Sequence, residues 1–98
     1  MIRIKLPYHL QNLAGTDAEV SIPNPENPTV LEVIRALEST YPTLRGVVID
    51  NTTGKRRAKV RLFACKQDIS HQEMSELLPE PVLTGEEPLL IVGAISGG

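Results

Sequence analysis

The sequence predicts one α+β domain, in which a mixed sheet of four to five strands carries one main helix across one face. Short segments alternate apolar and polar residues with the period of two that strands require, and one longer segment has the period of a helix. The last apolar segment has no polar alternation, which is typical of a strand in the centre of a sheet. The 98 residues allow a single domain with one modest core.

The first two strands are predicted from alternation near the N-terminus. In residues 2–6, isoleucine and leucine alternate with arginine and lysine, so aliphatic and cationic side chains fall on opposite faces. A polar loop is expected through Gln11, Asn12 and Gly15. Residues 18–22 alternate again and form the second strand, and the two strands are expected to pair as a hairpin.

The main helix is predicted over residues 29–40. Residues 23–28 contain three prolines and form a connection, because proline removes backbone donors and fixes the backbone dihedral. Thr29 stands three residues before Glu32, which is the spacing of a capping box. Apolar residues recur on one face at Val30, Val33, Ile34, Leu37 and Tyr41. Pro42 disfavours helical geometry at the preceding residue and ends the helix.

The middle of the chain is predicted to contain short elements. Residues 44–49 form a helical turn, and residues 50–54 carry the residue types of a turn. Residues 60–65 alternate and form the third strand. Residues 66–68 are expected to be a tight connection to a very short strand at 69–70.

The last third of the chain ends in an apolar strand and a glycine-containing tail. Residues 71–81 are expected to be polar and irregular, and residues 84–87 form a turn. Residues 89–92 are apolar on both faces, which predicts a buried strand in the centre of the sheet beside the first strand. The domain is therefore expected to span residues 1–92, followed by a flexible tail at 93–98.

Composition excludes several classes of function. Only three residues are aromatic and the formal net charge is −2, so neither base stacking nor phosphate binding is supported, and no nucleic-acid partner is expected. The single Cys65 forms no internal disulfide, and the charged N-terminus does not resemble a signal peptide. Apolar runs are far shorter than the ~20 residues that cross a bilayer. We expect a cytoplasmic protein with no membrane association.

No bound cofactor, metal site or catalytic constellation is predicted. His9, His71 and Cys65 are widely separated and show no ligand spacing. The glycines near the C-terminus are not followed by a helix whose N-terminus could receive a phosphate. No nucleophile, base and orienting group can be assembled, so the chain is expected not to be an enzyme.

The C-terminal diglycine suggests another kind of chemistry. Because Gly97 and Gly98 have no Cβ atoms, the tail can lie extended in a narrow channel that excludes larger residues, with its carboxylate presented to another enzyme's active site. A carboxylate is inert until it is activated. Activation by ATP would give an acyl-adenylate that sulfide, a persulfide or an amine can attack.

The order of elements and several segments resemble the ubiquitin-like sulfur carriers of the MoaD/ThiS family. This group includes the molybdopterin-synthase small subunit, the thiamine sulfur carrier and the cysteine-synthesis carrier. The resemblance rests on the strand order, on the end Leu90-Ile91-Val92-Gly93-Ala94-Ile95-Ser96-Gly97-Gly98, and on the segments Tyr41-Pro42-Thr43-Leu44-Arg45, Val60-Arg61-Leu62-Phe63-Ala64 and Gln67-Asp68-Ile69. Cys65-Lys66 departs from the Asn-Gly-like turn of many members, and residues 71–82 form a longer loop.

The resemblance implies a β-grasp (ubiquitin-like) fold and a carrier function. An ATP-dependent activating enzyme would adenylate Gly98, and sulfur transfer would convert it to a thiocarboxylate that a sulfur-accepting synthase uses in cofactor or cysteine biosynthesis. Gly97 would give steric access, and ATP would be consumed by the partner. The recipient pathway stays open between molybdopterin, cysteine, thiamine and a specialised metabolite. Two other functions remain: a protein modifier conjugated through Gly98 to lysines, or a non-catalytic interaction domain.

A partner-binding surface is predicted on the sheet face away from the helix. Phe63 and Arg61 fall on the same side of the third strand, and aromatic and arginine residues are enriched at interface centres. Leu90 or Ile91, whichever shares that face, is expected to extend this patch, and Leu90 is chosen as the site residue. Ile95 and Ser96, on the tail, are expected to contact the same partner.

Overall fold

The computed structural model describes residues 1–93, which contain both helices and strands. In chain order the elements are β1 (Ile2–Lys5), α1 (Tyr8–Ala14), β2 (Glu19–Ile22), α2 (Val30–Thr40), the 3₁₀ helix η1 (Pro42–Leu44), β3 (Val60–Ala64), β4 (Gln67–Asp68), α3 (Glu80–Leu83) and β5 (Leu89–Gly93).

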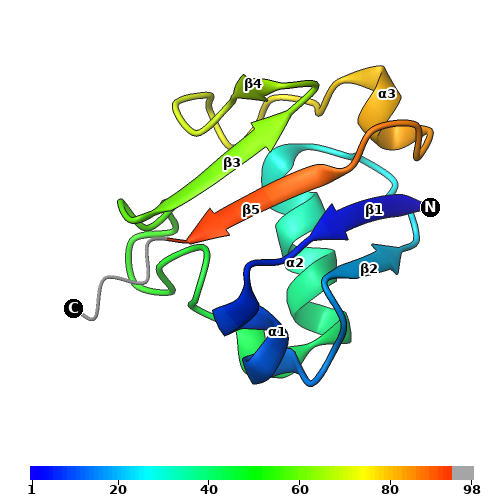
Figure 1. The fold of residues 1–98 in the computed structure, drawn as a ribbon. Coiled ribbons are helices and arrows are strands. Elements are labelled where there is room, and N and C mark those ends of the chain that lie inside the picture. Colours follow the sequence, from blue (N-terminus) through cyan, green and yellow to red (C-terminus); the bar gives the residue numbers. More distant parts are fainter. Residues whose placement is uncertain (94–98) are drawn as a thin grey trace.

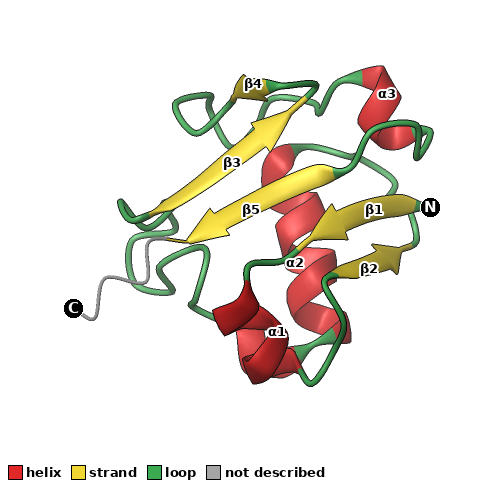
Figure 2. Cartoon of the chain, in the orientation of Figure 1, coloured by secondary structure: helices red, strands yellow, loops and turns green. Residues whose placement is uncertain are grey.

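The five strands form one mixed sheet in the order β2-β1-β5-β3-β4, with α2 across one face (Figures 1 and 2). β1 pairs parallel with β5 and antiparallel with β2. β3 pairs antiparallel with both β5 and β4. The predicted α+β sheet with one main helix is confirmed, and so is the position of the last strand in the centre beside the first.

The core lies between the sheet and α2. Alternate strand residues and one stripe of α2 face each other there, and all of them are buried: Ile2, Ile4, Val20, Ile22, Leu62, Ala64, Leu89, Ile91, Val30, Val33, Ile34 and Leu37. The prediction that the last strand is buried on both faces is wrong, because α2 covers only one face of the sheet. Val92 is 46% exposed and Leu90 is partly exposed on the other face.

The main helix begins and ends where the sequence predicts. Thr29 is the N-cap, and its Oγ1 accepts a hydrogen bond from the backbone N–H of Glu32 at 3.1 Å. The helix ends at Thr40, two residues before Pro42. The N–H groups of Val30 and Leu31, which have no acceptor within the helix, donate to carbonyl oxygens in the segment that precedes α3, so the first turn of α2 is satisfied by a distant part of the chain.

The loop predicted through Gln11, Asn12 and Gly15 is instead helix α1. Leu10 is almost fully buried and anchors the helix against the core. The side-chain amide of Gln11 donates to the carbonyl of Leu6 at 2.9 Å. Gly15 ends the helix in the left-handed conformation, at φ +67°, and its N–H bonds to the carbonyl of Gln11. One buried leucine in a short polar segment gave too little periodicity to reveal the helix.

Two short elements lie slightly earlier than predicted. The helical turn expected at 44–49 is η1, because the ring of Pro42 favours the first position of a helical turn and Leu44 is buried beneath it. The short strand expected at 69–70 is β4, so the connection is shorter than predicted. Cys65 and Lys66 alone make the turn, at φ +52° and +66°. Positive φ at both positions is the geometry of the common two-residue hairpin turn.

The polar segment predicted at 71–81 is not irregular throughout, because α3 begins at Glu80 and buries Val82 completely. The turn predicted at 84–87 is confirmed. It is held to β1 by Arg3, whose Nε donates to the carbonyl of Gly85 at 2.8 Å and whose Nη2 donates to the carbonyl of Glu86 at 3.1 Å. Arg3 thereby fixes the start of β5.

β5 includes Gly93, which was predicted to be the first residue of the tail. Gly93 pairs with Val60 in β3, so the sheet reaches one residue further than the predicted boundary.

None of the helices within residues 1–93 has the length and apolar character needed to cross a bilayer.

We predict that Leu10→Ala destabilises the domain by about 2–5 kcal/mol, because it leaves a cavity beside the core. Leu13→Ala, on the same helix but 40% exposed, is expected to cost less than about 1 kcal/mol. Urea unfolding followed by circular dichroism measures both. Equal effects would show that α1 does not pack as described.

Candidate functional site

The candidate site combines the end of β5 with the uncovered face of the sheet. Four predicted site residues, Gly97, Gly98, Ile95 and Ser96, lie outside the described residues. The last described residue is Gly93. A Cβ atom there would lie 3.6 Å from Cγ of Pro7, which is ordinary contact, so the chain leaves the sheet close to the start of α1.

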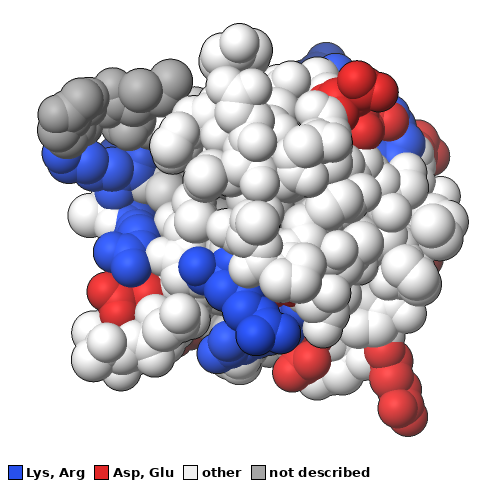
Figure 3. Space-filling view, turned by 90° about the horizontal axis from the view of Figure 1, so that it is seen from below, with Lys and Arg blue, Asp and Glu red and all other residues white. Residues whose placement is uncertain are grey.

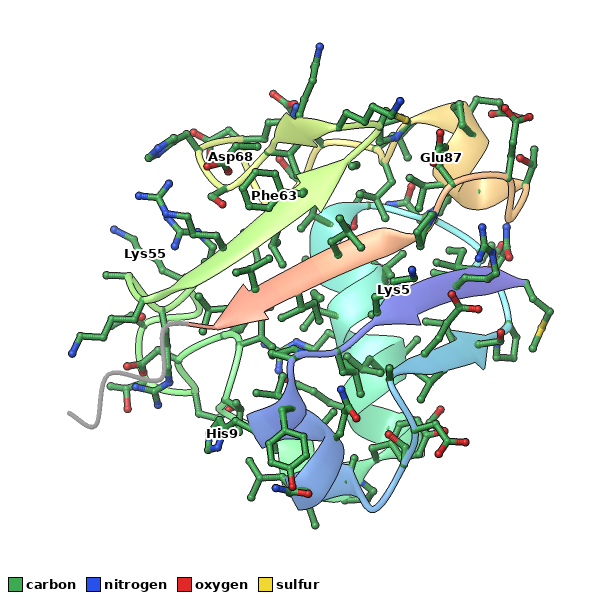
Figure 4. The ribbon with its side chains drawn as sticks, in the orientation of Figure 1. Lys5, His9, Lys55, Phe63, Asp68 and Glu87 are labelled. Atoms are coloured by element: carbon green, nitrogen blue, oxygen red, sulfur yellow. The ribbon has the colours of Figure 1, made fainter. Side chains whose placement is uncertain are left out.

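Strand register brings the other predicted site residues together. Phe63 lies directly opposite Leu90, and Arg61 lies opposite Val92. Leu90 is also level with Lys5 of β1. Residues directly opposite each other in neighbouring strands share a face, so Lys5, Arg61, Phe63, Leu90 and Val92 form one surface. We call this surface the open face; Figure 4 shows Phe63 on β3 and Lys5 on β1, with β5 between them.

Lys5 and Val92 are members of the open face that the sequence interpretation missed. The signal was present, since Lys5 alternates with Ile4 and Val92 alternates with Ile91, and both isoleucines are buried. Val92 was overlooked because the strand was interpreted as buried on both faces. The result is an apolar centre of Phe63, Leu90 and Val92 with a cation on each side.

Arg61 is held at one edge of the open face by an ion pair. Its Nη1 lies 2.9 Å from Oδ2 of Asp68, the residue opposite Phe63 in β4. Figure 4 shows Asp68 beside Phe63 at this edge of the sheet. Because both side chains of the pair are partly exposed, its main effect is on the orientation of Arg61 rather than on stability.

Asp68 is itself fixed by Ser70. Hydrogen bonds from the side chain and the backbone N–H of Ser70, together with the Arg61 guanidinium, lower the pKa of Asp68 from 3.8 to about 2. The backbone N–H donates to Oδ1 at 2.8 Å. The same serine is buried, and its Oγ accepts a hydrogen bond from the backbone N–H of Leu62 at 2.8 Å. The orientation of Arg61 is therefore tied to the backbone of β3.

A basic loop flanks the site. Seen from below (Figure 3), Lys and Arg side chains gather on the side where the loop between η1 and β3 lies in Figure 1. Two of its arginines have structural partners. The guanidinium of Arg56 donates to the carbonyls of Ser70, Arg57 and Val60, and that of Arg57 donates to the carbonyl of Gly46 and pairs with Asp50. The positive charges of these two arginines are therefore held in place beside the start of β3.

The described residues offer no metal centre. In residues 1–93, no three side chains of His, Cys, Asp or Glu lie close enough to hold an ion. Cys65 is a partly exposed free thiol in the β3–β4 turn.

Comparison with known proteins identifies structural relatives only. No protein-family model and no curated protein sequence matches the chain. Among solved structures, CysO from Mycobacterium tuberculosis superposes with a TM-score of 0.76 at 20% identity, over 97% of this chain and all of that one. SAMP1 from Haloferax volcanii gives 0.74 at 21% identity, over 98% of this chain and 97% of the other. CysO in a BexX/CysO complex from Amycolatopsis orientalis gives 0.75 at 19% identity, over the full length of both chains.

These likenesses establish the fold. The chain is a ubiquitin-like β-grasp domain, similar over nearly its whole length to CysO and to small archaeal modifier proteins. The resemblance to ubiquitin-like carriers that the sequence predicts is confirmed at this level. For CysO, one of the structures is a complex with another protein, BexX.

We predict that Asp68→Asn lowers the melting temperature near neutral pH and has a much smaller effect near pH 2. The folded-state pKa of Asp68 lies below its unfolded value, so the carboxylate stabilises the fold above pH 3.8, and this contribution is lost as pH falls through about 2. Thermal unfolding of both proteins across this range measures the difference. Asp17→Asn, in the exposed loop before β2, is the control, and a difference that was as large at pH 2 as at neutral pH would contradict the assignment.

Proposed function

We propose that this protein is a sulfur carrier, a protein co-substrate whose C-terminal Gly98 is adenylated by an ATP-dependent enzyme and converted to a thiocarboxylate. The observation that supports this proposal most strongly is the position of β5. It is the central strand, paired on both sides, and it ends at Gly93, only five residues before Gly98. A short segment that follows the central strand suits delivery of a carboxylate to another protein's active site.

The chemistry requires two displacements on the tail. A carboxylate oxygen of Gly98 attacks the α-phosphorus of ATP, and pyrophosphate leaves. A sulfide or persulfide sulfur then attacks the acyl carbon of the adenylate, and AMP leaves. With sulfide the product is the thiocarboxylate directly, and with a persulfide the resulting acyl disulfide is cleaved by a thiol. In this proposal the partner enzymes supply the catalytic groups, and this chain supplies the acyl group and a docking surface.

The open face is proposed as the surface that docks on these partners. Phe63, Leu90 and Val92 give it an apolar centre, with Lys5 and Arg61 as cations on either side. An aromatic residue surrounded by aliphatic side chains and charges is typical of an interface centre. The partners are an adenylating enzyme and a sulfur-accepting synthase of cofactor or cysteine biosynthesis, and we propose that these reactions take place in the cytoplasm.

A protein-modifier function is the second candidate. It is favoured by the similarity to SAMP1 proteins, which are described as small archaeal modifiers. The same adenylate would then be attacked by a lysine amine, which gives an isopeptide bond in place of a thiocarboxylate. The two functions share the adenylate and differ in the nucleophile that attacks it and in the product.

We predict that incubation with ATP, sulfide and the activating enzyme of the same organism raises the intact mass by the difference between one sulfur and one oxygen atom, about 16 Da. A variant that lacks Gly97 and Gly98 should fold normally and stay unmodified. Conjugates of higher mass with target proteins would favour the modifier function instead. No shift with an enzyme that adenylates its carrier would exclude the sulfur-carrier proposal.

We also predict that Phe63→Ala lowers kcat/KM for adenylation about tenfold or more, because truncation of an aromatic residue at an interface centre removes a large part of the binding energy. Pyrophosphate release at limiting carrier concentration measures this. Leu77→Ala is the matched control, since Leu77 is 60% exposed and lies outside the open face. Equal rates for the two variants would show that the open face does not dock.

A further inference from the structure

Charged side chains are distributed unevenly between the two ends of β5. The basic loop, residues 45–59, contains five lysines and arginines and one acid. Residues 76–87, which lead into β5, contain four glutamates and neither lysine nor arginine. Most of these charged side chains are exposed. The domain therefore has a positive end and a negative end, although its formal net charge is only −2.

The positive end is the end at which β5 finishes. The basic loop leads into β3, and Val60, the first residue of β3, pairs with Gly93, the last residue of β5. Figure 4 shows Lys55 at this end of the sheet and Glu87 near the start of β5. The positive charge is therefore concentrated where the chain leaves the sheet.

One of these positive charges is held directly beside the end of β5. Nη1 of Arg56 donates to the carbonyl of Val60, the residue opposite Gly93, and Nε donates to the carbonyl of Ser70 at 2.9 Å. Carbonyl groups carry no net charge, so these bonds fix the guanidinium without neutralising it. A charge that is already fixed loses little conformational entropy when a partner binds.

Two acids beside the basic loop offset only part of its charge. Oδ2 of Asp50 lies 3.6 Å from Nη1 of Arg57, and Glu73 lines a pocket together with Lys55 and Arg56. Five basic side chains against these two acids leave a positive excess. Figure 3 shows the resulting cluster of Lys and Arg side chains on this side of the domain.

We propose that the basic loop is attracted to an acidic protein surface around the entrance to the partner's adenylation site. This inference rests on the proposed carrier function and names the chemistry of the partner surface. Complementary charges raise the association rate of two proteins and orient them before contact. The acidic surface attracts the positive end of the domain and repels the negative end, so encounters in which β5 ends toward the partner are favoured.

The phosphates of ATP are a second source of negative charge, but they lie too far away. The five residues after Gly93 span up to about 17 Å when they are extended in a channel. Electrostatic attraction is screened over about 8 Å at physiological ionic strength. If Gly98 reaches the α-phosphorus, the basic loop meets the protein surface at the channel entrance rather than the nucleotide.

The test compares two charge reversals in the adenylation reaction with the activating enzyme of the same organism. Lys55→Glu and Lys66→Glu change exposed residues and alter the net charge equally. Lys66 lies in the β3–β4 turn, at the opposite end of β3 from Val60, so it is the matched control. Pyrophosphate release gives kcat and KM for the carrier and for ATP, and thermal unfolding checks that both variants are folded.

At about 20 mM salt, we expect Lys55→Glu to lower kcat/KM for the carrier about threefold or more with kcat unchanged, and Lys66→Glu to change it by less than about twofold. The difference should disappear at about 500 mM salt, because screening removes attraction between separated charges.

Equal kcat/KM values for the two variants at low salt would overturn the proposal and leave the carrier function intact. A higher KM for ATP in Lys55→Glu, with the KM for the carrier unchanged, would overturn it in favour of contact with the nucleotide. If the unchanged protein releases no pyrophosphate, the carrier function itself is rejected, and this inference with it.

Discussion

The pairing of β5 between β1 and β3 is the constraint on which the rest of this structure depends. It joins a strand near the N-terminus to one from the middle of the chain, the first pairing parallel and the second antiparallel. Its alternating side chains separate a face buried under α2 from the open face, and its last residue fixes where the tail leaves the domain. A change in the register of β5 by one residue would exchange Leu90 and Ile91 between the two faces and would destroy both the core and the proposed docking surface.

Strong periodicity explains how much of the fold could be predicted from the sequence. β1, β3 and α2 carry several apolar residues each at a regular spacing, and Thr29 and Pro42 mark the limits of the helix with specific backbone chemistry. The open face followed from the same alternation, because Phe63 and Arg61 must share a side of β3. The chemistry proposed for Gly98 came from a family resemblance, and the fold now agrees with that resemblance.

Features that depend on tertiary contacts could not be predicted. α1 forms because one leucine reaches the core and a glycine can end the helix in the left-handed conformation. Neither feature produces a periodic pattern in the sequence. The turn at Cys65 and Lys66 uses residue types that rarely adopt positive φ, so its position follows from strand pairing instead. Glu38 stands at an apolar position of the helix, where a charge was a signal that the sequence interpretation passed over.

The outer strands of the sheet decide how a partner can recognise this domain. β4 has only two residues and β2 has four, and β2 is followed directly by Pro23. Each edge therefore presents few unpaired backbone groups, and proline blocks extension of one of them. Recognition by addition of a partner strand to the sheet is disfavoured. Specificity must then come from side chains, so relatives with the same backbone can diverge in partner choice by substitution on one face.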